Sequence, residues 1–216
     1  MIPTLMHTTH YIHSTVDGDD LVAYMARVSN PSNQNNTTTA PRLINYLIKH
    51  KHWSPFEMVS MCLKIETTRS VAAQILRHRS FSFQEFSQRY APVTLDPVVP
   101  DLRLQDHSNR QNSIDSMNEY DKQQFQLQLR QHYDQSMWLY RQMLDAGVAK
   151  ECARDVLPLS TPTVLYMHGN LRSWLTYADL RTSNGTQMEH MTIATSVKEQ
   201  IAQYFPKCYA GMWVTD

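Results

Sequence analysis

The residues best able to bind an anion lie in the fourteen positions from Arg77 to Tyr90, which contain three arginines, a histidine, a carboxylate and three serines. Guanidinium groups hold phosphates through paired hydrogen bonds, and serine hydroxyls add further ones. The five glycines of the sequence are scattered, so neither a dinucleotide-binding glycine motif nor a P-loop can be assembled. This segment therefore predicts a pocket for a phosphorylated ligand, with arginines in place of a glycine-rich loop.

A helix is expected to lead into this segment. Residues 69–79 contain neither Gly nor Pro, and apolar residues recur in them at helical spacing. We expect the helix to end near Arg79 and to carry Gln74, Arg77 and His78 on one face. Attraction of cations to a helix C-terminus, about 0.3–1 kcal/mol each, would explain Arg77 and Arg79 without a ligand. It does not explain the polar residues that follow.

After this helix, Glu85, Ser87 and Arg89 alternate with Phe86 and Gln88. An extended backbone would point the carboxylate, the hydroxyl and the guanidinium in the same direction. No G-x-S-x-G elbow surrounds Ser87, so we interpret its hydroxyl as a ligand contact and not as a nucleophile. The alternation thus adds a second group of ligand-binding side chains to the predicted pocket.

Length and charge narrow the class of protein. A chain of 216 residues with 42% hydrophobic content fits one globular domain. Lys plus Arg equals Asp plus Glu at 20 each, so no bulk charge draws the chain to nucleic acid or to a membrane. No apolar run approaches the ~20 residues of a membrane span, and residues 1–9 lack signal-peptide features. We expect a cytoplasmic protein, located in the host cytoplasm if a virus encodes it.

The cysteines and histidines predict neither a disulfide framework nor a metal site. Cys62, Cys152 and Cys208 are few, odd in number and widely spaced, which is typical of reduced thiols. None has a neighbour in the sequence that would activate it as a nucleophile. The ten histidines contain no H-x-x-x-H pair, so a metalloenzyme is the weaker alternative.

The apolar patterns predict an α+β fold with a single domain. Strands are expected at 7–14, 57–67 and 163–167, and helices at 21–28, 39–48, 69–79, 113–146, 151–157, 170–181 and 186–205. Residues 29–40 are expected to form a mobile loop, and residues 91–112 an irregular connection. The long helix carries an apolar stripe from Phe125 to Leu144, which we assign to the core or to a subunit contact.

The same residues resemble the signature of a known family. Arg77-His78-Arg79, followed after seven residues by Ser87, is similar to the motif of the flavin-dependent thymidylate synthases. Four further positions match the longer family pattern: Ser82, Glu85, Arg89 and Tyr90. The turn His52-Trp53-Ser54-Pro55-Phe56-Glu57 resembles a second family element, with Met58 in place of its last histidine. The resemblance runs from Ser29 to Glu189.

This resemblance implies a central mixed sheet flanked by several helices, and a homotetramer whose active sites are shared between subunits. It implies that NADPH reduces a bound FAD and that a one-carbon unit passes from methylenetetrahydrofolate to dUMP, giving dTMP without an enzyme nucleophile.

The resemblance also implies the residues of the site. Those for dUMP are Gln74, Arg77, Glu85, Phe86, Ser87, Gln88, Arg89, Arg154 and Arg181. Those for FAD are Ser29, Ser54, Arg77, His78, Arg79, Gln84, Glu85, Asn170, Arg172 and Thr176. The catalytic group is Arg181, Ser87 and His52, with His52 near the folate.

Three departures from the family pattern leave alternatives open. Gln84 stands where Asn is usual, Thr176 where an amide is expected, and Gly185-Thr186-Gln187 where His-Ala-Gln is common. They are compatible with a weaker FAD site, or with hydroxymethylation of the same pyrimidine, in which water completes the exocyclic group. A non-enzymatic nucleic-acid-binding protein, with Phe81, Phe83 and Phe86 as stacking faces, is disfavoured by the balanced charge.

Overall fold

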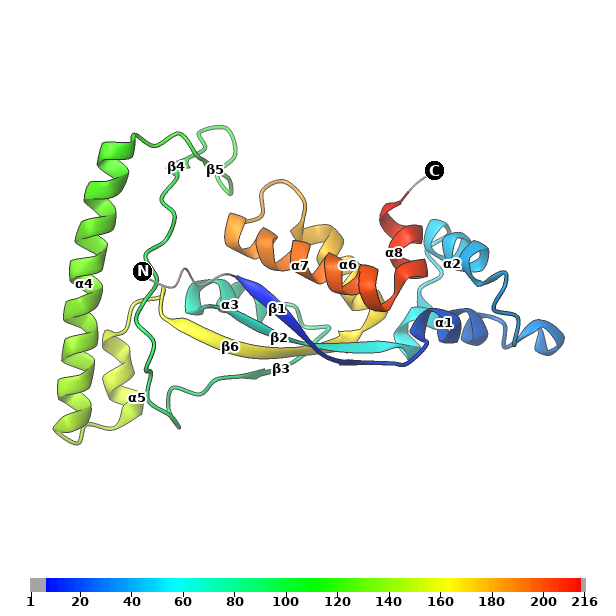
Figure 1. Cartoon of the computed structure of the whole chain (residues 1–216), viewed down its shortest axis with the longest axis horizontal. Coiled ribbons are helices and arrows are strands. Elements are labelled where there is room, and N and C mark those ends of the chain that lie inside the picture. Colours follow the sequence, from blue (N-terminus) through cyan, green and yellow to red (C-terminus); the bar gives the residue numbers. More distant parts are fainter. Residues whose placement is uncertain (1–6, 215–216) are drawn as a thin grey trace.

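An antiparallel sheet forms the centre of the protein, as the computed structural model of residues 7–214 shows (Figure 1). Its strands are β1 (Thr8–Ser14), β2 (Ser60–Thr68), β6 (Pro162–Asn170) and β3 (Ser82–Glu85), in the order β1-β2-β6-β3. Each described strand runs opposite to its neighbours. The α+β class is confirmed, but the sheet is antiparallel and not mixed, because β6 enters between β2 and β3 in the direction opposite to both.

Alternation of side chains along β2 separates a buried face from an open one. Met61, Leu63 and Ile65 are fully buried, as their period of two predicts. Helices α6 (Leu171–Arg181) and α7 (Met188–Tyr204) lie over this face (Figure 1). The indole of Trp174 donates a hydrogen bond of 2.9 Å to the carbonyl of Met61, which satisfies a polar group inside the apolar core.

A second group of helices packs at one end of the sheet. It comprises α1 (Gly18–Ala26), α2 (Ala40–Lys49) and α8 (Pro206–Trp213), together with the 3-10 turns η1 (Pro31–Asn33) and η2 (Ser54–Met58). Helix α8 has no counterpart in the sequence-based expectation; it starts at Pro206, whose fixed φ suits a first helical position. No helix within residues 7–214 has the length and apolar character needed to cross a membrane.

The segment that follows β2 differs from its prediction. Helix α3 (Arg69–Ile75) ends four residues before Arg79, and Arg77 and His78 lie in tight turns. The reason lies outside the local sequence: Phe81 is buried against Trp174, at 4.7 Å between ring centroids, and this contact turns the chain. Strand β3 then stops at Glu85, so the predicted extended stretch through Arg89 is wrong.

The long helix α4 (Glu119–Asp145) begins later than expected, because residues 113–114 form strand β5. Asn118 caps its start by accepting from the backbone N–H of Tyr120 at 2.9 Å. Only its second half is core: Met137 and Tyr140 belong to a separate apolar cluster and Tyr133 is also buried, whereas Phe125 is 51% exposed. The apolar stripe thus divides into a packed half and an open half.

Short elements complete this part of the molecule. Helix α5 (Lys150–Ala153) and the turn η3 (Arg154–Val156) pack on α4. Strands β4 (Leu104–Gln105) and β5 (Ser113–Ile114) form a small hairpin at the end of the irregular connection. Figure 1 shows the connection running beside α4 toward the start of α7. The hairpin therefore lies where it can contact the N-terminal end of α7.

Candidate functional site

A cavity of about 550 Å³ brings together four of the predicted site residues. Its lining consists of Gln74, Arg77, His78, Arg181, Gln111, Gly185, Thr186 and Gln187. Gln74 comes from α3, the next two from the turns after it, and Arg181 from the last turn of α6. Gln74, Arg77 and His78 do not share one helix face as expected, because α3 ends before Arg77. All three side chains nonetheless line the same cavity.

His78 and Arg181 form a direct hydrogen bond in this cavity. The Nε–H of Arg181 donates to Nε2 of His78 at 3.0 Å. Burial, and then the positive charge of Arg181, lower the pKa of His78 to about 4. His78 is therefore a neutral acceptor at physiological pH, and the two Nη groups of Arg181, which have no hydrogen-bonding partner within residues 7–214, are available to a ligand.

A polar network that the sequence reasoning missed runs from the cavity lining at Gln187 and Gln74 to a buried pair behind it, His190 and Tyr177. Nε2 of Gln74 donates to Oε1 of Gln187 at 2.5 Å, and Oε1 of Gln74 lies 3.2 Å from Nδ1 of His190. The hydroxyl of Tyr177 lies 3.0 Å from Nε2 of His190. His190 continues the apolar stripe of α7 one turn before Ala194, and a polar residue in that register was the available signal.

The β4–β5 hairpin closes one side of the cavity. Arg103, which precedes it, forms a buried ion pair with Glu189 at 2.8 Å and donates to the hydroxyl of Ser113 at 3.0 Å. The loop of the hairpin carries Gln111 into the cavity lining. Gly185, with φ of +89°, faces this loop, so the backbone conformation at this departure from the family pattern favours glycine.

The residues from Glu85 to Arg89 form a second group at the end of β3. Glu85 accepts from Arg69 at 2.5 Å and from Thr163 at 2.9 Å. Arg89 pairs with Glu151 of α5 at 2.9 Å, and both side chains are more than half exposed. Such exposed pairs contribute about 0–1 kcal/mol, so a ligand could recruit Arg89 at little cost.

Gln88 and Phe86 of this group have different surroundings. Gln88 is buried, and its Nε2 has no hydrogen-bonding partner within the described residues. Phe86 lines an apolar cavity of about 220 Å³ together with Glu66 and Val93. A buried amide without a partner is costly, at about 1–3 kcal/mol. Gln88 is therefore a buried polar group with an unsatisfied amide within the described residues. Ser87 is exposed, and Arg154 begins η3, three residues after the Glu151 that pairs with Arg89.

A third group lies where η2 meets α6. Arg172 pairs with Glu57, and the hydroxyl of Thr176, one turn later, donates to the carbonyl of Arg172 at 2.9 Å. Asn170 caps α6 by accepting from the N–H of Ser173 at 2.9 Å. Ser54 begins η2, so this group collects four of the positions expected for FAD.

The remaining positions are dispersed. Ser29 lines a cavity of about 510 Å³ beside Arg42 and Tyr46. His52 is exposed near the ring of Tyr46, while Arg79 and Gln84 are exposed on the turn and on β3.

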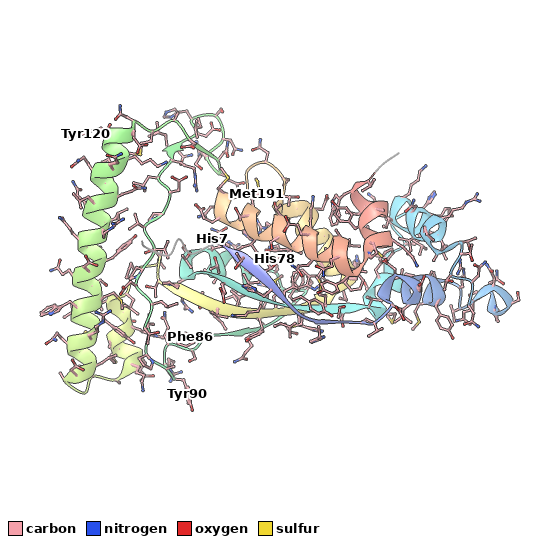
Figure 2. The ribbon with its side chains drawn as sticks, in the orientation of Figure 1. His7, His78, Phe86, Tyr90, Tyr120 and Met191 are labelled. Atoms are coloured by element: carbon pink, nitrogen blue, oxygen red, sulfur yellow. The ribbon has the colours of Figure 1, made fainter. Side chains whose placement is uncertain are left out.

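No hydrogen bond or ion pair joins the cavity of Arg181 to the group of Arg89 within residues 7–214. Figure 2 shows His78 near α6 and α7, whereas Phe86 and Tyr90 lie below the sheet near α5. One chain thus presents the expected nucleotide residues in separate groups.

The cysteines lack the features of a nucleophile. Burial raises the pKa of the Cys62 thiol, and burial together with Asp19 raises that of Cys208. Cys152 is exposed on α5. No group of His, Cys, Asp or Glu suited to a metal occurs among the described residues.

The fold and cavities are those of an α+β protein with arginine-lined ligand sites. A profile of the Thy1 family, thymidylate synthase complementing protein, matches residues 11–207. A probable flavin-dependent thymidylate synthase of Paramecium bursaria Chlorella virus 1 is 53% identical over 91% of both chains. A flavin-dependent thymidylate synthase of Synechocystis sp. is 46% identical over 90% of this chain and 89% of that relative. The chain belongs to the flavin-dependent thymidylate synthase family.

A solved structure shares the fold. The crystal structure of a UMP/dUMP methylase, PolB, from Streptomyces cacaoi bound with 5-Br dUMP superposes with a TM-score of 0.85 at 30% identity, covering 94% of this chain and 93% of that chain. The family resemblance read from the sequence is thereby confirmed.

Proposed function

We propose that this protein converts dUMP to dTMP by reductive methylation, with methylenetetrahydrofolate as the one-carbon donor and NADPH as the reductant of a bound FAD. Family membership supports the reaction class. The observation that carries the proposal is the cavity in which Arg77, Arg181 and the amide of Gln74 surround a neutral His78. It offers cations and amide donors to an anionic nucleotide without any glycine-rich loop.

The dUMP site is proposed to combine two groups from different subunits of a homotetramer. Gln74, Arg77 and Arg181 would come from one chain. The residues Glu85, Phe86, Ser87, Gln88, Arg89 and Arg154 would come from another. The separation of the groups within one chain supports this arrangement, as does the exposed apolar surface on the first half of α4.

The proposed FAD site comprises the following residues: Ser29, Ser54, Arg77, His78, Arg79, Gln84, Glu85, Asn170, Arg172 and Thr176. The four that meet at η2 and α6 fit a flavin diphosphate in chemistry, since they supply hydroxyl, amide and guanidinium donors on an exposed surface. Arg172 is held only by a pair with Glu57 in which both side chains are more than a third exposed, so the guanidinium can turn to an anion at small cost. When bound, FAD supplies the hydride that completes the methyl group.

Arg181, Ser87 and His52 are proposed as the residues that act on the reactants. The free Nη groups of Arg181 can donate to a pyrimidine oxygen and stabilise negative charge there. Neutral His78 accepts a hydrogen bond from the Nε–H of Arg181 and so keeps the guanidinium facing the cavity. Ser87, with no base beside it, would contact the nucleotide, and the exposed His52 would contact the folate.

Two measurements test the proposal. Added FAD should acquire a shifted visible spectrum and quenched fluorescence in the presence of the protein. Incubation with dUMP, methylenetetrahydrofolate and NADPH should then give dTMP, identified by mass. A colourless protein that leaves the FAD spectrum unchanged would refute the cofactor assignment, and a product heavier than dTMP by one oxygen would indicate hydroxymethylation instead.

A further inference from the structure

Six side chains form one line of hydrogen bonds from the hairpin to the core. In order they are Arg103, Glu189, Gln187, Gln74, His190 and Tyr177. Gln74 and Gln187 line the Arg181 cavity, whereas His190 and Tyr177 are at most 1% exposed and lie behind it. The line therefore connects a buried pair to a side chain that we assign to the nucleotide.

One end of the line fixes the direction of its bonds. Burial raises the pKa of Glu189, but hydrogen bonds from Arg103 and Gln187 more than offset this and hold it below its usual value. The ionised carboxylate accepts only. Gln187, whose Nε2 lies 2.8 Å from Glu189, must direct its NH₂ group there and its carbonyl oxygen toward Gln74.

The direction then passes through Gln74 to the core. Because Nε2 of Gln74 donates to the carbonyl of Gln187, the Oε1 of Gln74 must accept from Nδ1–H of His190. Nε2 of His190 is left with a lone pair, which accepts from the hydroxyl of Tyr177 at 3.0 Å. Reversing any amide would place two oxygen atoms, or two N–H groups, in contact.

The state of His190 agrees with this assignment. Burial, and then the charge of Arg181, lower its pKa to about 3, so the ring is neutral and has one donor and one acceptor. The hydroxyl of Tyr177 remains a donor because burial raises its pKa.

We propose that His190 and Tyr177 are positioning residues which, together with Glu189, hold the amide of Gln74 in a single orientation at the nucleotide cavity. The inference rests on the proposed function, since it takes Gln74 as a dUMP contact. The remaining N–H and lone pair of Gln74 are then presented at fixed positions, so the cavity favours ligands with a complementary acceptor and donor.

A double-mutant cycle on the full-length, FAD-loaded protein separates positioning from mere support of the fold. The dUMP dissociation constant is measured by calorimetry for Gln74→Ala, His190→Phe and the double variant. His190→Phe should raise the constant about threefold to tenfold, as expected for one hydrogen bond. In the Gln74→Ala background it should have no further effect.

Tyr140→Phe is the matched control. It removes the hydroxyl that accepts from the N–H of Val93 in the other apolar cluster, so it should lower stability and leave dUMP affinity unchanged. An unchanged dUMP affinity in His190→Phe would overturn the positioning inference. So would an equal loss of affinity from His190→Phe in the wild-type and Gln74→Ala backgrounds. Neither result would contradict the proposed function. An unchanged affinity in Gln74→Ala overturns the nucleotide assignment of this cavity as well.

A second measurement does not depend on the folding of the His190 variant. Long-range proton–nitrogen spectra of the histidine-labelled wild-type protein report which ring nitrogen carries the proton. The signal of His190, identified by its shift in Tyr177→Phe, should show the Nδ1–H tautomer from about pH 6 to 8, since its pKa lies well below that range. An Nε2–H tautomer would overturn the orientation derived for Gln74.

Discussion

Replacing Arg103 by Met is the most informative perturbation of stability. The guanidinium of Arg103 contacts both carboxylate oxygens of Glu189, at 2.8 and 3.0 Å, and the two side chains are only 9% and 16% exposed. Methionine retains much of the apolar volume but leaves the carboxylate without its cation. The variant thus isolates the charge of Arg103 from its packing.

The expected loss follows from this burial. Removing one partner of a buried ion pair costs about 3–5 kcal/mol, because the other charge stays buried and unpaired. The residual exposure of Glu189 places the expected loss near the lower value, about 3 kcal/mol. Arg141→Met is the matched control: Arg141 pairs with Asp96 at 3.1 Å with both side chains mostly exposed, so its loss should be about 0–1 kcal/mol.

The assay is urea unfolding at a fixed protein concentration, since association of subunits would shift the midpoint. With a slope of about 1–3 kcal/mol per molar urea, Arg103→Met should lower the midpoint by about 1 M or more. Equal shifts for Arg103→Met and Arg141→Met would refute the claim that the buried pair stabilises the hairpin.

The pH dependence of the loss provides a second check. In the wild type the pKa of Glu189 is lowered, so its stabilising contribution is present above the usual carboxyl pKa and is lost as the pH falls through the lowered value. Without Arg103, part of this lowering is lost, so the pKa of Glu189 is higher in the variant than in the wild type, and protonation relieves the unpaired charge at a higher pH. The difference between wild type and variant should therefore be largest near pH 7 and should shrink toward about pH 4.

Three further predictions concern the active site. Replacing Cys62, Cys152 and Cys208 together by Ala should leave dUMP methylation within about tenfold of the wild-type rate, about 1.4 kcal/mol of barrier; abolished turnover in a folded, FAD-loaded variant would reopen a covalent mechanism. Arg89→Ala should weaken dUMP binding by about 2–5 kcal/mol if its pair with the nucleotide is desolvated, and should affect FAD less; equal losses would assign Arg89 to the fold. Refolding Arg89→Ala together with Arg181→Ala should restore part of the activity; no recovery, with subunit exchange shown by a mass tag, would contradict a site shared between these two residues.

Local periodicity was sufficient for the sheet core but not for the ends of elements. The alternation of Met61, Leu63 and Ile65 is a property of the strand itself, so the sequence predicts it. The end of α3 depends on burial of Phe81 against Trp174, a contact between residues far apart in the sequence. Nothing between residues 69 and 79 signals that contact.

The site shows the same division. Arg77, His78 and Arg181 could be chosen by residue type and family pattern, and the structure places them around one cavity. The orientation of Gln74 could not be predicted, because its partners Gln187 and His190 are separated from it by 113 and 116 positions. Hydrogen-bond direction is a property of the assembled network and leaves no local pattern in the sequence.

The position of β6 within the sheet has a consequence for synthesis of the chain. Strand β6 lies between β2 and β3, so β3 is attached to the sheet only through a strand that begins at residue 162. Until the ribosome has released that strand, β2 and β3 each present an unpaired edge, and such edges are prone to intermolecular pairing. Both groups of residues proposed to bind the nucleotide also lack their support until then. Folding of this enzyme is thus tied to about the last quarter of the chain, and pairing over such long separations is expected to be slow.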